Sequence, residues 1–128
     1  MQKKIAVLLF GLCVVCALSV FPSDGAQYYN IVKNMGYDCL DEPVEVCEIN
    51  IPEEFNAVYL RYNKLQKSGG YDLSLYRGKS CVRYTYLIPE ENARANILVY
   101  CGKIIGGDIC SITLDGIMIP LQKSCEKG

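Results

Sequence analysis

The feature that most constrains this chain is its supply of cysteines in the absence of any histidine. Two of the eight cysteines, Cys13 and Cys16, lie in an N-terminal apolar run. The other six are Cys39, Cys47, Cys81, Cys101, Cys110 and Cys125. An even number of cysteines in a short exported chain is typical of a disulfide framework. We therefore expect a small extracellular domain that is held together by three disulfides.

The N-terminal run has the layout of a secretory signal peptide. Two lysines precede an uncharged stretch from Ile5 to Leu18, and Ala17-Leu18-Ser19 is a small-x-small cleavage pattern. Such a segment is too short and wrongly flanked to span a membrane. We predict a signal peptide over residues 1–19 with cleavage after Ser19, and cleavage after Ala26 is the alternative. No later stretch is apolar enough to span a bilayer, so the mature chain should have no membrane span.

Size and charge limit what the mature chain can do. Removing 19 of 128 residues leaves 109, the size of one domain, with 11 basic and 14 acidic residues. No basic block is present, and binding to nucleic acid or to an anionic membrane needs clustered positive charge. We therefore expect neither partner. We divide the mature chain into a lead-in over residues 20–43 and a β domain over residues 44–128.

Alternating apolar and polar residues predict an all-β fold. The candidate strands are Val44–Ile51, Ala57–Tyr62, Tyr71–Arg77, Cys81–Ile88, Ala95–Cys101, Ile109–Leu114 and Ile117–Ile119. Turn signals separate them at Ser68–Gly70, Gly78–Ser80, Pro89–Asn92, Gly106–Asp108 and Asp115-Gly116. This pattern predicts six or seven short strands in a disulfide-stapled antiparallel sandwich or open barrel.

One disulfide follows from the expected pairing of the strands. If the turn after Ile88 centres on Glu91 and Asn92, Cys81 and Cys101 face each other across the hairpin, within disulfide range. Pairs between Cys39 and Cys47 and between Cys110 and Cys125 would complete a sequential set. Six cysteines allow fifteen connectivities, so the other pairings remain open.

Most catalytic and metal sites cannot be built from these residues. A Ser-His-Asp or Cys-His site needs histidine, and the six thiols are better explained as disulfides. No two mature cysteines have the tight spacing of a zinc site. Carboxylate pairs such as Glu53-Glu54 and Glu90-Glu91 lie beside prolines, which is typical of solvated turns. We therefore expect a protein that is not an enzyme and has no metal and no cofactor.

Tyrosine is the enriched side chain, with ten copies and no tryptophan. Tyrosine and arginine are favoured at recognition surfaces because they bury area while keeping a polar tip. The candidate binding face is Tyr62, Tyr76, Arg77 and Arg83. The alternative is that the tyrosines simply fit the half-buried surface of a sheet.

These observations favour a secreted, non-enzymatic binding protein that acts on an extracellular protein or receptor, including effectors of the venom or salivary type. A protease inhibitor is one alternative, with Lys64–Gly70 (carrying Lys67) or Pro89–Arg94 (carrying Arg94) as the exposed loop. A carrier of a small apolar ligand is the other. Its pocket would be lined by Ile104, Ile105, Ile112, Leu114, Ile117 and Ile119.

Overall fold

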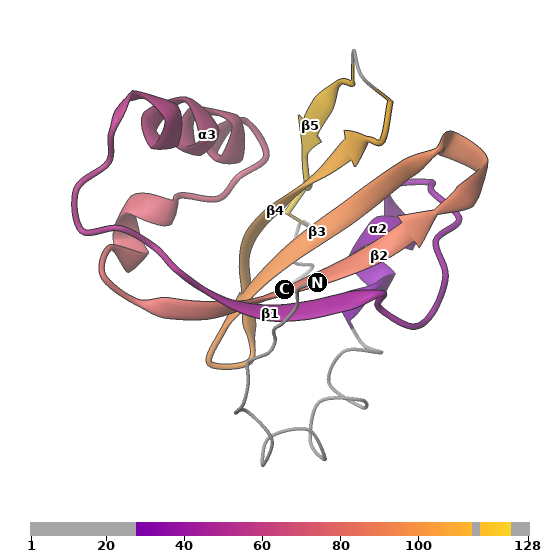
Figure 1. The fold of residues 1–128 in the computed structure, drawn as a ribbon, viewed down its shortest axis with the longest axis horizontal. Helices are drawn as coiled ribbons and strands as arrows, with labels where there is room; N and C mark the ends of the chain where they lie inside the picture. Colours follow the sequence, from indigo (N-terminus) through magenta and orange to yellow (C-terminus); the bar gives the residue numbers. More distant parts are fainter. Residues whose placement is uncertain (1–27, 114–115, 124–128) are drawn as a thin grey trace, which may run out of the picture.

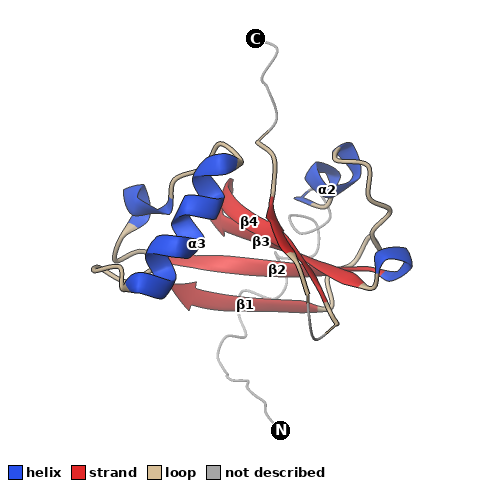
Figure 2. Cartoon of the chain, turned by 90° about the horizontal axis from the view of Figure 1, so that it is seen from above, coloured by secondary structure: helices blue, strands red, loops and turns tan. Residues whose placement is uncertain are grey.

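The fold is one antiparallel sheet with helices packed against it. A computed structural model describes residues 28–113 and 116–123. The strands are β1 (Glu45–Asn50), β2 (Ser80–Ile88), β3 (Ala93–Tyr100), β4 (Lys103–Ser111) and β5 (Met118–Pro120), and they neighbour one another in chain order. The helices are α2 (Asn30–Asn34), α3 (Ala57–Ser68) and the 3-10 helices η2 (Leu73–Tyr76) and η3 (Pro89–Glu91). Figures 1 and 2 show α3 and α2 toward different ends of the twisted sheet.

The antiparallel, mainly β character of the chain is confirmed, but the finer architecture is not a sandwich or barrel. The described residues form five strands in a single sheet instead of six or seven in two sheets or a closed barrel. Helices cover the sheet where a second sheet was expected, because two of the predicted strands are helical.

Two tight turns set the register of the central strands. Between β3 and β4, Tyr100 pairs with Lys103, and the intervening Cys101 and Gly102 have φ angles of 51° and 77°. Positive φ at both positions matches the primed two-residue turns that suit the twist of a hairpin. Between β2 and β3, the chain turns through η3 and Asn92, which has a φ of 53°. The turn between β2 and β3 places Val82 opposite Val99.

The sheet has an apolar core on each face. On the α2 face, Tyr84, Tyr86 and Ile97 pack with Ile31 and Val32 of α2. The tyrosine rings continue into this core, since Tyr29 meets Tyr86 edge to face with 6.2 Å between ring centroids. On the α3 face, a second core consists of Ile51, Leu73, Cys81, Leu98 and Ile105. Alternation along each strand sends neighbouring side chains to opposite cores.

The expected strand Ala57–Tyr62 is wrong, because these residues begin α3. Asn56 caps the helix, with its side-chain oxygen accepting from the Tyr59 N–H at 2.8 Å. The buried residues of α3 are Asn63 and Gln66, whereas Val58 and Leu60 are exposed. The helix therefore buries polar side chains and exposes apolar ones. For this reason the spacing of its apolar residues does not show the helical period.

The expected strand Tyr71–Arg77 is also wrong. Asp72 accepts hydrogen bonds from the backbone N–H and the hydroxyl of Ser74, at 3.0 and 2.6 Å, and so begins the 3-10 helix η2. Leu73 is fully buried while Leu75 is 72% exposed, so these residues do not share a buried face. The side chain of Asn63 ties η2 to α3, since its oxygen accepts from the Leu73 N–H at 2.7 Å.

The Gly106–Asp108 segment is not a turn, because all three residues lie inside β4 and are buried. A Cβ on Gly106 would lie 2.7 Å from Oε1 of Gln66, and one on Gly107 would overlap the backbone oxygen of Asn96. These glycines allow the close approach of α3 and β3 to β4.

The expected C-terminal hairpin is present as a pairing of its two strands. Cys110 pairs with Met118 and Ile109 with Ile119. Leu114 and Asp115, at the predicted turn, lie outside the described residues, as do the predicted signal peptide at 1–19 and Cys125.

Candidate functional site: a polar row across the sheet

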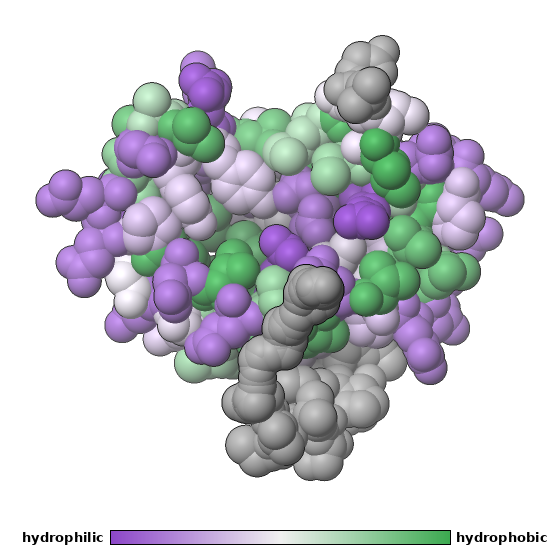
Figure 3. Space-filling model, in the orientation of Figure 1, coloured by the Kyte–Doolittle hydropathy of each residue, from purple (hydrophilic) through white to green (hydrophobic). Residues whose placement is uncertain are grey.

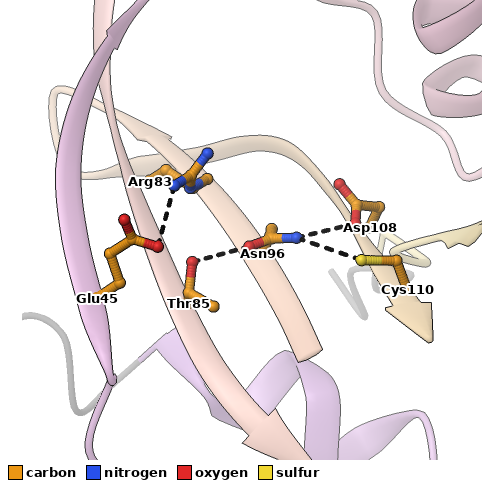
Figure 4. Close-up of polar contacts among 6 residues, drawn as sticks. All are labelled: Glu45, Arg83, Thr85, Asn96, Asp108 and Cys110. Atoms are coloured by element: carbon orange, nitrogen blue, oxygen red, sulfur yellow. Dashed lines mark hydrogen bonds and ion pairs between the residues drawn. The ribbon is translucent and has the colours of Figure 1, made fainter. Parts of the chain in front are cut away.

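A row of polar side chains crosses four strands on the α3 face of the sheet (Figure 4). We call it the polar row, and its members are Glu45, Arg83, Thr85, Asn96, Asp108 and Cys110. Register places Glu45, Thr85, Asn96 and Asp108 side by side on successive strands. Side chains on one face of a sheet in this alignment lie within contact distance.

Hydrogen bonds connect the row. The Thr85 hydroxyl donates to Oδ1 of Asn96 at 2.8 Å, and the Asn96 amide donates to Oδ1 of Asp108 at 3.1 Å (Figure 4). The same amide lies 3.9 Å from the sulfur of Cys110. At the other end of the row, Arg83 forms an ion pair with Glu45 at 3.1 Å.

Asp108 is the most unusual member, because it is a carboxylate that is only 3% exposed. The Tyr62 hydroxyl of α3 donates to its Oδ2 at 2.5 Å. No ion pair involves Asp108 among the residues that the structure describes. Burial raises the pKa of Asp108 from its ordinary value, and the hydrogen bonds from Tyr62 and Asn96 only partly oppose this effect. The hydrogen bond to Tyr62 therefore joins α3 to β4 through a carboxyl group that resists ionisation.

The pKa of Tyr62 is raised as well. Its burial, followed by the neighbouring charge of Asp108, raises the pKa of its phenol, so it stays protonated as the donor. Asp108 is buried and Tyr62 is half-buried, so their hydrogen bond links α3 to β4 between the helix and the sheet.

The part of the α3 face that α3 leaves uncovered is partly apolar. In the next row of the sheet, Leu87, Arg94, Cys110 and Met118 are paired in register across four strands. Arg94 and Met118 are exposed, as is Ile112, two residues beyond Cys110. We call Leu87, Arg94, Cys110, Ile112 and Met118 the open-face patch. Figure 3 shows hydrophobic and hydrophilic residues side by side at the end of the molecule away from α3.

The four residues of the predicted binding face lie at two different places in the structure. Tyr62 points inward to Asp108, and Arg83 pairs with Glu45 beside it. Tyr76 instead packs on Tyr100, with 5.5 Å between ring centroids, and Arg77 lies over the ring of Phe55 at 4.6 Å. Arg83 thus belongs to the polar row and Tyr62 hydrogen-bonds to it, whereas Tyr76 ends η2 and Arg77 follows it.

The described cysteines are free thiols in the structure. The register of β2 and β3 places Cys81 level with Tyr100 rather than with Cys101, which lies in the turn. Cys81 is buried while Cys101 is exposed, so the expected Cys81–Cys101 disulfide is not formed. The pairing of Cys39 with Cys47 is not formed either, since Cys39 lies in the core of the α2 face and Cys47 is on β1. Cys125, the expected partner of Cys110, lies outside the described residues.

The two loops proposed for a protease inhibitor have regular structure. Lys64–Ser68, with Lys67, forms the last turns of α3. Pro89–Glu91 is the 3-10 helix η3, and Arg94 lies on β3. Neither segment is the extended exposed loop that such an inhibitor would present.

The isoleucines proposed to line a pocket are also separated. Ile105 is in the core of the α3 face, whereas Ile104 and Ile119 pack against the core of the α2 face. Ile112 and Ile117 are exposed at 49% and 71%, and Leu114 lies outside the described residues. These side chains therefore do not enclose a common space.

Sequence reasoning missed Thr85, Asn96 and Asp108. Asp108 was expected in a turn, and the other two were expected within strands with no functional role assigned. The available signal was alternation, because Thr85 on β2 and Asn96 on β3 fall on the side of the sheet opposite to the buried tyrosines.

None of the helices within the described residues is both long and apolar enough to cross a membrane. No group of three or more cysteine, aspartate or glutamate side chains within residues 28–113 and 116–123 is arranged to hold a metal ion.

Comparison with known proteins gives one result. A family model described as a domain of unknown function, DUF4830, matches residues 31–109, which run from α2 into β4 and include the polar row except Cys110. No curated protein and no solved structure matches the chain. Since the family model covers more than half of the sequence, the chain belongs to the DUF4830 family.

Proposed function

We propose that this protein is a secreted, non-enzymatic binding protein that recognises an extracellular protein through the open-face patch. The observation that carries this proposal is the exposure of Arg94 and Met118 on one side of the sheet, with Ile112 nearby. Arginine and methionine are enriched in protein interfaces, and an arginine surrounded by apolar side chains is a frequent anchor. The apolar N-terminal run with its cleavage pattern supports export.

The polar row supports the same proposal by holding the patch rigid. Asn96 and Asp108 lie directly beside Arg94 and Cys110 along β3 and β4. Their hydrogen bonds to Thr85 and Tyr62 join β2, β3, β4 and α3. A surface that is already ordered loses less conformational entropy when a partner binds.

A double variant, Arg94→Glu with Met118→Ser, tests the patch. We expect it to fold normally, because both side chains are exposed, and to retain a bound extracellular protein about tenfold less than the natural chain, a change of about 1.4 kcal/mol. The measurement is quantitative mass spectrometry of proteins captured from the extracellular fluid in which the protein is made.

The matched control is Lys103→Glu with Val58→Ser, which makes the same charge change and removes one exposed apolar side chain elsewhere. It should retain the partner at the natural level. Equal retention by both double variants would show that the open-face patch does not carry the binding.

A further inference from the structure

The outer edge of β1 is a second surface with its own chemistry. Among the described residues, β1 pairs only with β2, so its other side has no strand neighbour. The strand is six residues long, contains no proline, and keeps a continuous register with β2 from Glu45 to Asn50. A regular edge of this kind is a template for pairing with a further strand.

The unpaired backbone groups can be assigned by alternation. Ile51, which continues the register of β1, donates its N–H to the oxygen of Lys79 at 2.9 Å. In an antiparallel ladder the residues that bond to one neighbour alternate with those that point away from it. The N–H and C=O groups of Val46 and Glu48 therefore point away from β2.

The segment that contains this edge is strongly acidic, and two of its carboxylates, Glu45 and Glu48, lie on β1 itself. Seven of the chain's 14 acidic residues fall between Asp38 and Glu54, and no lysine or arginine falls among them. All seven are exposed. Lys33 lies 3.9 Å from Asp38 and 3.6 Å from Asp41, and Arg83 pairs with Glu45. The other four acidic side chains, Glu48 of β1 among them, form no such ion pair with a described residue, so this segment has a net negative charge that favours a basic partner.

We propose that the outer edge of β1 binds an extended lysine- or arginine-rich segment of another protein as a sixth, antiparallel strand. A second copy of this chain fits poorly, because pairing β1 with β1 would bring two acidic edges together. The stretch at 20–27 contains no lysine or arginine, so it does not supply the required charge either. This surface is separate from the open-face patch, and each proposal can fail without the other.

The side chains of β1 define the pattern of the ligand. Glu45 and Glu48 are three residues apart and lie on opposite faces of the sheet, with the exposed Val46 between them. An added antiparallel strand would place basic side chains opposite the two glutamates and an apolar side chain opposite Val46. The favoured motif therefore has two basic residues separated by two β-prone residues.

The test uses a labelled synthetic peptide with two such Lys-x-x-Lys motifs, in which x is valine or threonine. Fluorescence anisotropy with the full secreted chain should give a Kd below about 1 mM. The Kd should rise as salt is added, because salt screens the charges. Val46→Pro removes one outward N–H but leaves the ladder to β2 intact, and it should weaken binding about tenfold. Val46→Ala keeps that N–H and should retain most of the affinity.

Charge is tested with a matched pair. Glu48→Lys should weaken binding several-fold, whereas Glu90→Lys, the same change in the exposed turn before β3, should leave it nearly unchanged. The proposal is overturned if the peptide does not bind, because the charges would then only protect the edge. It is also overturned if Val46→Pro binds as well as Val46→Ala, or if the natural chain forms a dimer that Val46→Pro abolishes.

Discussion

Replacing Gly107 with alanine should lower the free energy of unfolding by about 3 kcal/mol. Gly107 has a φ of 151°, which side chains rarely tolerate, and an added Cβ would overlap the backbone oxygen of Asn96. It would also lie 2.6 Å from Cδ1 of the buried Leu121. Neither neighbour can move freely, since one is the backbone of β3 and the other is core. A loss of this size is a large share of the stability of a small domain.

Gly102→Ala is the matched control for this prediction. Gly102 also has a positive φ, 77°, but nothing lies within 4 Å of its added Cβ. Its cost should be about 1 kcal/mol, from backbone conformation alone. Urea unfolding followed by circular dichroism measures both variants. Equal losses would mean that Gly107 is not closely packed and that the docking of β3 against β4 is misplaced.

The second large effect concerns Asp108. Asp108→Ala leaves the partly buried Tyr62 hydroxyl and Asn96 amide without their acceptor, and it should cost about 2–3 kcal/mol. Asp108→Asn keeps the size and an acceptor oxygen, so it separates the role of the hydrogen bonds from that of the charge. We expect Asp108→Asn to be much less damaging near neutral pH.

The difference in stability between Asp108→Asn and the natural chain should depend on pH in one direction. Because burial raises the pKa of Asp108 above the unfolded value of 3.8, the folded state holds its proton more tightly. The stabilisation is complete below pH 3.8 and is lost as the pH rises through the folded pKa. The stability of Asp108→Asn relative to the natural chain should therefore increase as the pH rises through that window.

Asp72 provides a control, because its pKa is lowered and its effect on stability should change with pH in the opposite direction. Hydrogen bonds from Asn63 and Ser74 lower its pKa to about 2, so its stabilisation is present above pH 3.8 and is lost as the pH falls toward 2. Asp72→Asn should lose stability relative to the natural chain in neutral solution and not in acid. Urea unfolding at a series of pH values tests both residues. A stability difference for Asp108→Asn that does not change with pH would contradict the raised pKa.

The sequence predicted the centre of the sheet well. The strands Cys81–Ile88 and Ala95–Cys101 correspond closely to β2 and β3, because both are rich in β-branched and aromatic residues and a proline-containing turn separates them. The segment from Val44 to Ile51 likewise corresponds to β1. In these strands the local pattern and the burial in the fold agree.

The failures occur where burial involves polar side chains or glycine. Gln66 is fully buried on α3 and accepts from the Gly107 N–H at 2.8 Å, so α3 docks on β4 through an amide and a glycine. Apolar periodicity cannot detect such a contact. Apolar periodicity does not reveal the polar row either. Its members come from four strands, and their contacts can be predicted only when the register of those strands is known.

The acidic segment was visible as seven carboxylates between Asp38 and Glu54, but only the sheet order shows that Glu45 and Glu48 lie on a strand whose outer side has no neighbour among the described strands. Likewise, the expected Cys81–Cys101 disulfide depended on a turn centre that the four residues between Ile88 and Ala93 shift by one position. Small errors in register thus change which side chains face each other.

The proposed function depends first on export of the chain. The most direct test is the intact mass and N-terminal sequence of the protein recovered from the medium of cells that express residues 1–128. The proposal predicts recovery from the medium of a 109-residue chain that begins at Val20, or one that begins at Gln27 if cleavage follows Ala26. A chain that stays in the cells and retains Met1–Ser19 would contradict an extracellular binding protein.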